Sequence, residues 1–194
     1  MYTHIREVVL QYVPDFTEEE LNAIEKNFYH KSLKKHEYLL KVGEVANEVV
    51  FINKGIMRNY VPVPNKGQIT NYFAEENMFN TSSVSFFTRN PSFEAIQAIE
   101  PCKILAIQYD SLQQLYNQYH NWEKLGRLFV ESILIEQDFR LRWFIEQSAQ
   151  ERYEKFSQNY PHLLQRVQQY HIASYLGITP ESLSRLRSRS QKNQ

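Results

Sequence analysis

The chain has 194 residues, of which 42% are hydrophobic and 23% charged, and its formal net charge at pH 7 is +0. No apolar run approaches the ~18 residues that a membrane-spanning helix needs, and no basic segment followed by an apolar core opens the chain. We therefore expect a cytoplasmic protein with no membrane partner. A single cysteine, Cys102, excludes an internal disulfide framework and a cluster held by several thiolates.

The charge is unevenly distributed along the chain. Residues 148–194 contain seven basic and three acidic residues, a net charge of +4, which leaves −4 on residues 1–147. This asymmetry is expected when only the C-terminal segment meets a polyanion.

The first part of the chain predicts a short helix followed by strands. Thr17 and Glu20 form a capping-box pattern ahead of apolar residues at helical spacing. Between Leu33 and Tyr109, short runs rich in Val, Ile, Tyr and Phe are separated by turn signals such as "NKG" and "PNKG". Short strands at this spacing predict a β-sandwich or barrel.

The next segment predicts a long helix, broken at most once, because residues 121–156 contain no proline and only one glycine. Its apolar residues cover more than one face, so the helix needs two partners. We expect one side to pack on the β domain and the other on the same helix of a second chain. A helix buried inside one domain is the alternative. The candidate dimer contacts are Leu125, Leu128, Ile135 and Phe139, and a hinge is expected near Ser148.

The segment "HIASYLGITPESLSRLRSRS", residues 171–190, predicts two short helices joined by a tight turn. Gly177 is suited to end the first helix and Pro180 to begin the second. At about 100° per residue, Leu183 and Leu186 share one face of the second helix and point back to the first. The opposite face is small, polar and basic.

That polar face has the composition of a helix that reads the major groove of DNA. Arginine can bond a guanine edge in bidentate fashion, small serines allow close approach, and a carboxylate can accept from cytosine or orient the arginine. A helical hairpin with a solvated charged face is the alternative. The candidate DNA contacts are Glu181, Ser182, Ser184, Arg185, Arg187, Ser188 and Arg189.

Two segments resemble the cyclic AMP receptor protein and fumarate-nitrate reductase regulator superfamily (Crp/Fnr). They are "KKHEYLLKVGEVANEVVFINKGIMRNYV", with turns at Gly43, Glu44 and Gly55, and "IASYLGITPESLSRLR". The resemblance covers nearly the whole chain. It implies that Glu181, Ser184 and Arg185 are the base-reading positions of an E-x-x-S-R pattern, and that Arg187 and Arg189 meet phosphates. Because the chain stops soon after Arg189, we expect no room for a wing hairpin.

The same resemblance implies a ligand cassette in "NMFNTSSVSFFTRNPSFEAIQA", but its contents differ. Thr81 and Ser82 stand where the family has a glycine–glutamate pair for ribose, and Ser92 and Phe93 stand where it has an arginine–serine pair for the cyclic phosphate. A phosphate buried without its arginine loses a charge-assisted contact. We therefore expect no cyclic AMP binding, although another small molecule could use a pocket lined by Asn80, Ser82, Ser83, Arg89, Ser92 and Phe93.

Other chemistries find little support. The five glycines form neither a dinucleotide-binding nor a phosphate-binding loop, and no serine lies in a nucleophile elbow. The six histidines, of which the last is His171, lack metal-ligand spacing and are read as surface or capping residues. One histidine would suffice for haem, but nothing singles one out. We predict no enzyme activity, no metal and no cofactor, and the effector stays unknown.

These observations predict an α+β protein in three parts. An antiparallel β-roll of jelly-roll type occupies residues 1–120, a dimerisation helix residues 121–147, and a winged-helix-like helix-turn-helix domain residues 148–194. The predicted function is a homodimeric, sequence-specific transcription regulator. The alternatives are a constitutive DNA binder whose roll has lost sensing, and a ligand- or partner-binding module without DNA binding. Candidate partners are double-stranded DNA with a near-palindromic operator, a second copy of the chain, RNA polymerase and an unidentified small-molecule effector.

Overall fold

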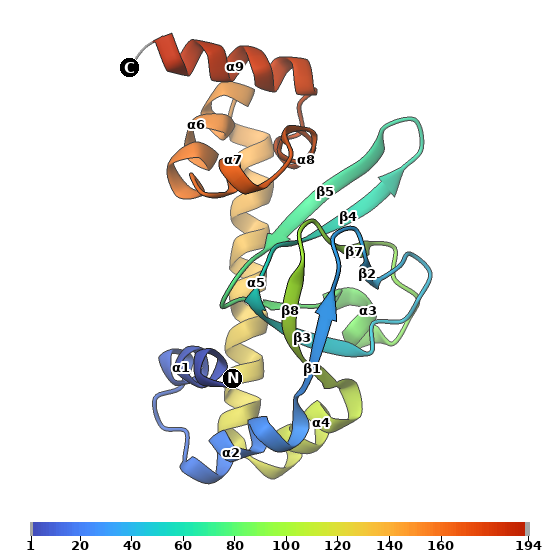
Figure 1. Ribbon diagram of the computed structural model, residues 1–194, viewed down its shortest axis with the longest axis vertical. Helices are drawn as coiled ribbons and strands as arrows, with labels where there is room; N and C mark the ends of the chain where they lie inside the picture. Colours follow the sequence, from blue (N-terminus) through green and yellow to red (C-terminus); the bar gives the residue numbers. More distant parts are fainter. Residues whose placement is uncertain (1, 193–194) are drawn as a thin grey trace. The chain divides into compact units, whose positions relative to one another are not determined.

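The computed structural model describes residues 2–192 and consists of antiparallel β-sheets followed by helices (Figure 1). The strands are β1 (Tyr29–Leu33), β2 (Tyr38–Leu40), β3 (Glu48–Lys54), β4 (Met57–Val63), β5 (Gly67–Ala74), β6 (Phe79–Asn80), β7 (Ala95–Ala98) and β8 (Cys102–Gln108). The helices are α1 (Thr3–Tyr12), α2 (Glu18–Asn27), α3 (Ser83–Thr88), α4 (Tyr109–Gln118), α5 (His120–Glu146), α6 (Ala149–Asn159), α7 (Leu163–Arg166), α8 (Gln169–Leu176) and α9 (Pro180–Lys192). The α+β class expected from the sequence is confirmed.

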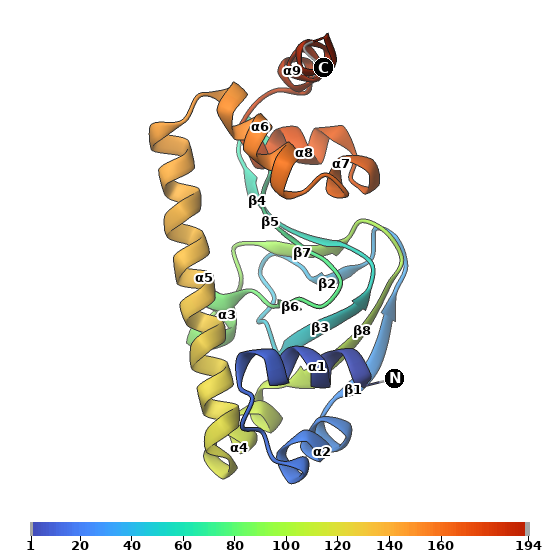
Figure 2. The same cartoon turned by 90° about the vertical axis from the view of Figure 1, so that its left-hand side faces the viewer.

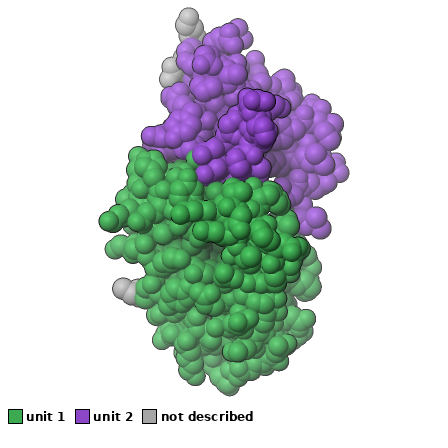
Figure 3. Space-filling view, turned by 90° about the vertical axis from the view of Figure 1, so that its right-hand side faces the viewer, with its two compact units in different colours: residues 1–59, 73–133 green, residues 60–72, 134–194 purple. Residues whose placement is uncertain are grey.

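The chain divides into two compact units (Figure 3). Unit 1 comprises residues 1–59 and 73–133, and unit 2 comprises residues 60–72 and 134–194. The long helix and the β4–β5 hairpin therefore each contribute to both units. This division falls within the long helix and places residues 60–72 of the hairpin with the C-terminal helices. It does not test the three-part division predicted from the sequence, which stays a prediction.

The strands form two sheets with the orders β1-β8-β3-β6 and β2-β7-β4-β5. β3 and β8 pair antiparallel, with Phe51 opposite Leu105 and Ile52 opposite Ile104. These four side chains are almost completely buried and form the centre of the unit 1 core. Each apolar side chain buried in such a core contributes roughly 1.5–3 kcal/mol to folding.

The turn between β3 and β4 requires a glycine. Gly55 has a φ of +104°, and a Cβ there would lie 2.7 Å from the carbonyl oxygen of Pro101 and 2.9 Å from the Cα of Cys102. The backbone conformation and the close approach of another strand end both exclude a side chain. Cys102 is buried against the same turn.

The N-terminal helices close one end of unit 1. Thr17 and Glu20 form the predicted capping box at the start of α2, with the Glu20 carboxylate accepting from the Thr17 amide at 2.8 Å. The Glu20 carbonyl accepts from the indole N–H of Trp122 at 3.2 Å, which ties α2 to the beginning of α5. The ring of Trp122 also meets the ring of Phe16 edge-on at 5.4 Å.

The long helix α5 has 27 residues and ends at Glu146. Figure 2 shows it as one continuous helix. The next helix begins because Ser148 and Glu151 form a second capping box, with the Ser148 hydroxyl donating to the Glu151 carboxylate at 2.7 Å. The long helical segment is therefore broken once, next to Ser148, whereas the hinge expected there stays a prediction. The break has a local cause that the S-x-x-E spacing could have revealed.

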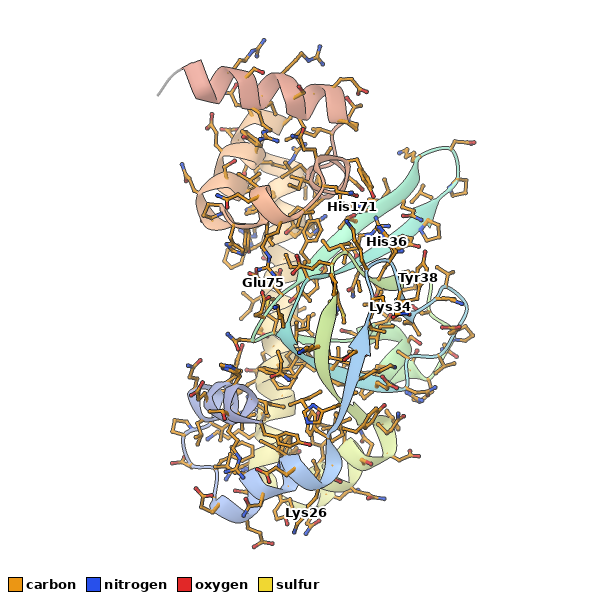
Figure 4. The ribbon with its side chains drawn as sticks, in the orientation of Figure 1. Lys26, Lys34, His36, Tyr38, Glu75 and His171 are labelled. Atoms are coloured by element: carbon orange, nitrogen blue, oxygen red, sulfur yellow. The ribbon has the colours of Figure 1, made fainter. Side chains whose placement is uncertain are left out.

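Helices α6 to α9 in unit 2 enclose a separate core. Its buried apolar side chains are Tyr153, Phe156, Leu163, Val167, Ile172, Ala173, Tyr175, Leu176 and Leu183. His171 is buried as well, and its ring centroid lies 3.9 Å from that of Tyr170. The expectation of a surface position is therefore wrong for His171, which Figure 4 places on α8.

Candidate functional site

The turn between α8 and α9 is a Schellman motif. Gly177 has a φ of +68°, its N–H donates to the Ser174 carbonyl at 3.2 Å, and the Ile178 N–H donates to the Ala173 carbonyl at 3.0 Å. A left-handed residue at this position satisfies two carbonyls at the helix end and reverses the chain. A Cβ at Gly177 would lie 2.7 Å from the ring of Phe144, so this glycine also has a packing role.

The back of α9 is apolar and its front is exposed. Leu183 is fully buried and Leu186 is half-buried, in agreement with the predicted inner face. Glu181, Ser184, Arg185, Ser188 and Arg189 are exposed, while Ser182 and Arg187 are half-buried. The helix therefore presents a polar, basic surface above a packed leucine.

A chain of side-chain hydrogen bonds connects the start of α9 to Arg185. The Thr179 hydroxyl accepts from the Ser182 N–H at 3.2 Å, and the two hydroxyl oxygens also lie 3.2 Å apart. The Arg185 guanidinium donates to the Ser182 hydroxyl at 3.1 Å. Thr179 was not among the predicted site residues, although a threonine before a proline-led helix is a cap signal.

Glu181 is ionised beside this arginine. Hydrogen bonds from its own backbone N–H and from Thr179 lower the pKa of Glu181 below the ordinary value of 4.5, and the charge of Arg185 lowers it further. The hydrogen-bonding partner of Arg185 is nevertheless Ser182. In this structure the Ser182 hydroxyl, and not the Glu181 carboxylate, therefore orients the Arg185 side chain.

The predicted cassette in the roll is closed by its own hydrogen bonds. The Ser82 and Ser92 hydroxyls, both buried, lie 3.0 Å apart, and the Ser92 hydroxyl also donates to the Glu94 carbonyl at 2.8 Å. Asn80 is buried and exchanges two side-chain hydrogen bonds with Asn59. Ser83 is half-buried at the first turn of α3, and Phe93 is exposed.

Arg89 does not reach toward Ser92. Its guanidinium donates to the Ala46 carbonyl at 2.7 Å and to the Asn47 side chain, and it lies 4.0 Å from the ring centroid of Tyr109. These contacts use the arginine to fasten the loop before β3. The Arg89 guanidinium therefore supplies no positive charge to the cassette.

The structure shows a larger and a smaller cavity in unit 1, and none of the six predicted pocket residues lines either of these two. One, of about 410 Å³, is bordered by residues 44–48, Leu39, Leu40, Thr81 and Ile96. The other, of about 40 Å³, is lined mainly by aromatic side chains, including Phe79, Phe86 and Phe129. Sequence reasoning missed both because their walls come from segments far apart in the chain.

The four predicted dimer contacts on α5 differ in exposure. Leu125 is buried inside unit 1, where it lines the small aromatic cavity, so it cannot form the main contact with another chain. Leu128 is half-buried. Ile135 and Phe139 are 57% and 60% exposed. Three further apolar residues of the helix are also more than half exposed, and these are Leu134, Leu141 and Ile145.

The sequence matches the family described as "Cyclic nucleotide-binding domain" over residues 30–119. It is also 28% identical, over 186 residues, to the fumarate and nitrate reduction regulatory protein of Yersinia pestis. That match covers 89% of this chain and 71% of the relative. Over most of its length the chain is therefore similar to a regulatory protein of the Crp/Fnr type. The E-x-x-S-R pattern at Glu181, Ser184 and Arg185 lies on the exposed face of α9.

Solved structures have the same fold. FixK2 from Bradyrhizobium japonicum superposes with a TM-score of 0.77 at 17% identity, covering 86% of this chain and 85% of that one. A protein from Eubacterium rectale, described as a transcriptional regulator of the Crp/Fnr family, gives a TM-score of 0.72 at 16% identity and covers 94% of this chain and 88% of its own. The Crp/Fnr fold therefore extends through the helices of unit 2.

Other site types are unsupported in the part of the chain that the structure describes. Within residues 2–192, no group of three or more His, Cys, Asp or Glu side chains could hold a metal ion. No helix in the same range is long and apolar enough to cross a membrane.

Proposed function

We propose that this Crp/Fnr regulator is a homodimer that binds DNA sequence-specifically through α9. The observation that carries the proposal is the exposed face of that helix, where Glu181, Ser184 and Arg185 stand above the buried Leu183. Glutamate can accept from cytosine, arginine can bond guanine with two hydrogen bonds, and the small serine permits close approach. Arg187 and Arg189 flank this face and suit phosphate contacts.

The dimer contact is assigned to the second half of α5. Leu134, Leu141 and Ile145 recur at i, i+7 and i+11, so they form one stripe, and each is more than half exposed. Such a stripe supports packing against the same helix of a second chain. A two-fold dimer places its reading helices in successive major grooves, about 34 Å apart, and therefore calls for a near-palindromic operator.

The roll is proposed not to bind cyclic AMP. A cyclic phosphate needs a cation, but Arg89 is bonded to Ala46 and Asn47, and Ser82 and Ser92 are bonded to each other. Opening that pair would expose two buried hydroxyls without supplying a positive charge. The closed cassette also favours a second candidate function, a constitutive DNA binder whose roll serves as a scaffold.

Selection of duplexes from a random DNA pool tests the proposal. We expect a palindrome whose affinity falls steeply with salt, because neutralised phosphates release counterions. Arg185→Ala should lose about 1–3 kcal/mol of discrimination at one base pair in each half-site. Arg127→Ala, which removes an exposed arginine ion-paired with Glu131 on α5, is the control and should bind like the wild type.

Two results would argue against this function. Recovery of no consensus, with weak binding at low salt only, would point to a module that has abandoned DNA. A consensus that Arg185→Ala binds as well as the wild type would remove α9 from base reading.

A further inference from the structure

The C-terminal carbonyls of α8 are held by two arginines from other helices. Arg140 of α5 donates to the Tyr175 carbonyl at 3.1 Å, and Arg152 of α6 donates to the Leu176 carbonyl at 3.0 Å. Helix ends leave such carbonyls without intrahelical partners, and a cation at this end also suits the helix dipole. The first helix of the helix-turn-helix is thereby fixed to α5 and α6.

The β4–β5 hairpin is fixed to the same helix by a serine. The Ser174 hydroxyl donates to the Gln68 carbonyl at 2.9 Å and accepts from the Thr70 N–H at 2.8 Å. β5 is the last strand in its sheet, so its outer N–H and C=O groups have no neighbouring strand. One hydroxyl on α8 satisfies a donor and an acceptor of this edge. Figures 1 and 2 both show the hairpin running beside α8.

Arg140 joins all three elements at one point. The same terminal nitrogen that bonds the Tyr175 carbonyl also donates to the Thr70 carbonyl at 3.2 Å. Its guanidinium lies 4.0 Å from the ring centroid of Tyr175, and it faces Glu136 one turn earlier on α5. The planar guanidinium suits this combination of stacking and hydrogen bonding, which a lysine could not reproduce.

The contact also has a desolvation cost that favours release. Among the residues that the structure describes, Thr70 Oγ1 and Arg140 Nη1 are buried without a hydrogen-bond partner. Burying such atoms carries a free-energy penalty that undocking would remove. The hairpin contact therefore combines specific hydrogen bonds with the free-energy penalty of two buried polar atoms that lack a partner.

We propose that the hairpin, residues 60–72, docks on α8 and sets the orientation of the helix-turn-helix, with Ser174 and Arg140 as positioning residues. The docking does not cover the reading face, because Glu181, Ser184 and Arg185 stay exposed. It therefore orients the helix and does not block it. The docking itself is independent of DNA, whereas its effect on operator affinity rests on the proposed function. Fixed orientation matters most when two reading helices must fit two half-sites at once.

Amide hydrogen exchange on the full chain tests the docking directly. Ser174→Ala and Arg140→Met should each speed exchange at the Thr70 amide at least tenfold. Two matched variants in the same unit serve as controls: Ser157→Ala, whose hydroxyl bonds only within α6, and Arg142→Met, which removes an exposed ion pair on α5. Both should leave hairpin exchange unchanged. Equal exchange in the Ser174 and Ser157 variants would overturn the docking.

DNA affinity then tests the positioning role. Ser174→Ala should bind the selected palindrome about tenfold more weakly than the wild type, yet bind a duplex with one half-site equally well. Equal losses on both duplexes, or no loss on the palindrome, would overturn positioning. If the wild type binds neither duplex, the proposed function fails.

In that case, the distance between spin labels at Lys66→Cys and Gln158→Cys tests the positioning role. Ser174→Ala should broaden the distribution of this distance, and an unchanged distribution would overturn positioning.

Discussion

Removing the Ser182 hydroxyl should weaken sequence-specific DNA binding without weakening general attraction to DNA. Ser182 lies between Thr179 and Arg185 and accepts a hydrogen bond from the Arg185 guanidinium at 3.1 Å. Immobilising a long side chain at an interface costs about 0.5–1.5 kcal/mol. In the free protein this bond already orders the Arg185 side chain in part. In Ser182→Ala the whole cost of immobilising Arg185 would instead fall on DNA binding.

The exposure of the bond decides the size of the effect. Arg185 is exposed and Ser182 only half-buried, so the contribution should lie near the lower limit, about 0.5 kcal/mol or roughly twofold for each reading helix. Two helices of a dimer acting on a palindrome give about 1 kcal/mol, roughly fivefold. Because Ser182 carries no charge, non-specific affinity and its salt dependence should not change.

Fluorescence anisotropy with the selected palindrome and with an unrelated duplex measures both quantities. Ser182→Thr keeps the hydroxyl and should restore wild-type affinity. The reasoning would be refuted if Ser182→Ala bound the palindrome as tightly as the wild type, or if Ser182→Thr were as weak as the alanine variant.

Three further outcomes are expected. Leu183→Ala removes a fully buried side chain beneath α9 and should lower the free energy of unfolding by about 2–5 kcal/mol in urea titrations, whereas a change below ~1 kcal/mol would place Leu183 outside the core. Burial raises the pKa of Glu136 above 4.5, so the folded state holds this proton more tightly than the unfolded state does. Glu136→Gln should therefore gain stability over the wild type as pH rises above that value, and a stability difference between variant and wild type that is the same at about pH 4 and about pH 7 would contradict this. Cyclic AMP should leave the melting temperature unchanged, and a rise would show that the cassette opens.

Local features of the fold could be predicted from the sequence because their causes lie within a few residues. The capping box at Thr17 depends on a side chain three positions away, and the reversal at Gly177 depends on a glycine and on backbone hydrogen bonds that span three and five positions. The buried position of Leu183 followed from helical periodicity alone.

Contacts between distant segments were not predictable in this way. Ser174 meets Thr70 across 104 positions of the chain, and no periodic pattern relates the two. The burial of Leu125 likewise depends on strands and helices that converge on it, whereas helical periodicity gave only its face. Arg89 was considered for the cassette because of its proximity in sequence, but its left-handed backbone, with a φ of 60°, belongs to a residue that ends α3 and fastens the loop before β3.

The reversal at Gly177 also links two positions that are 33 residues apart in the sequence. The ring of Phe144 occupies the space that a side chain at 177 would need. The side chains at positions 144 and 177 therefore compete for the same space, and a larger residue at one position requires a smaller residue at the other. Among homologues, a residue larger than glycine at 177 must tolerate the left-handed backbone, and it should occur together with a smaller residue at 144.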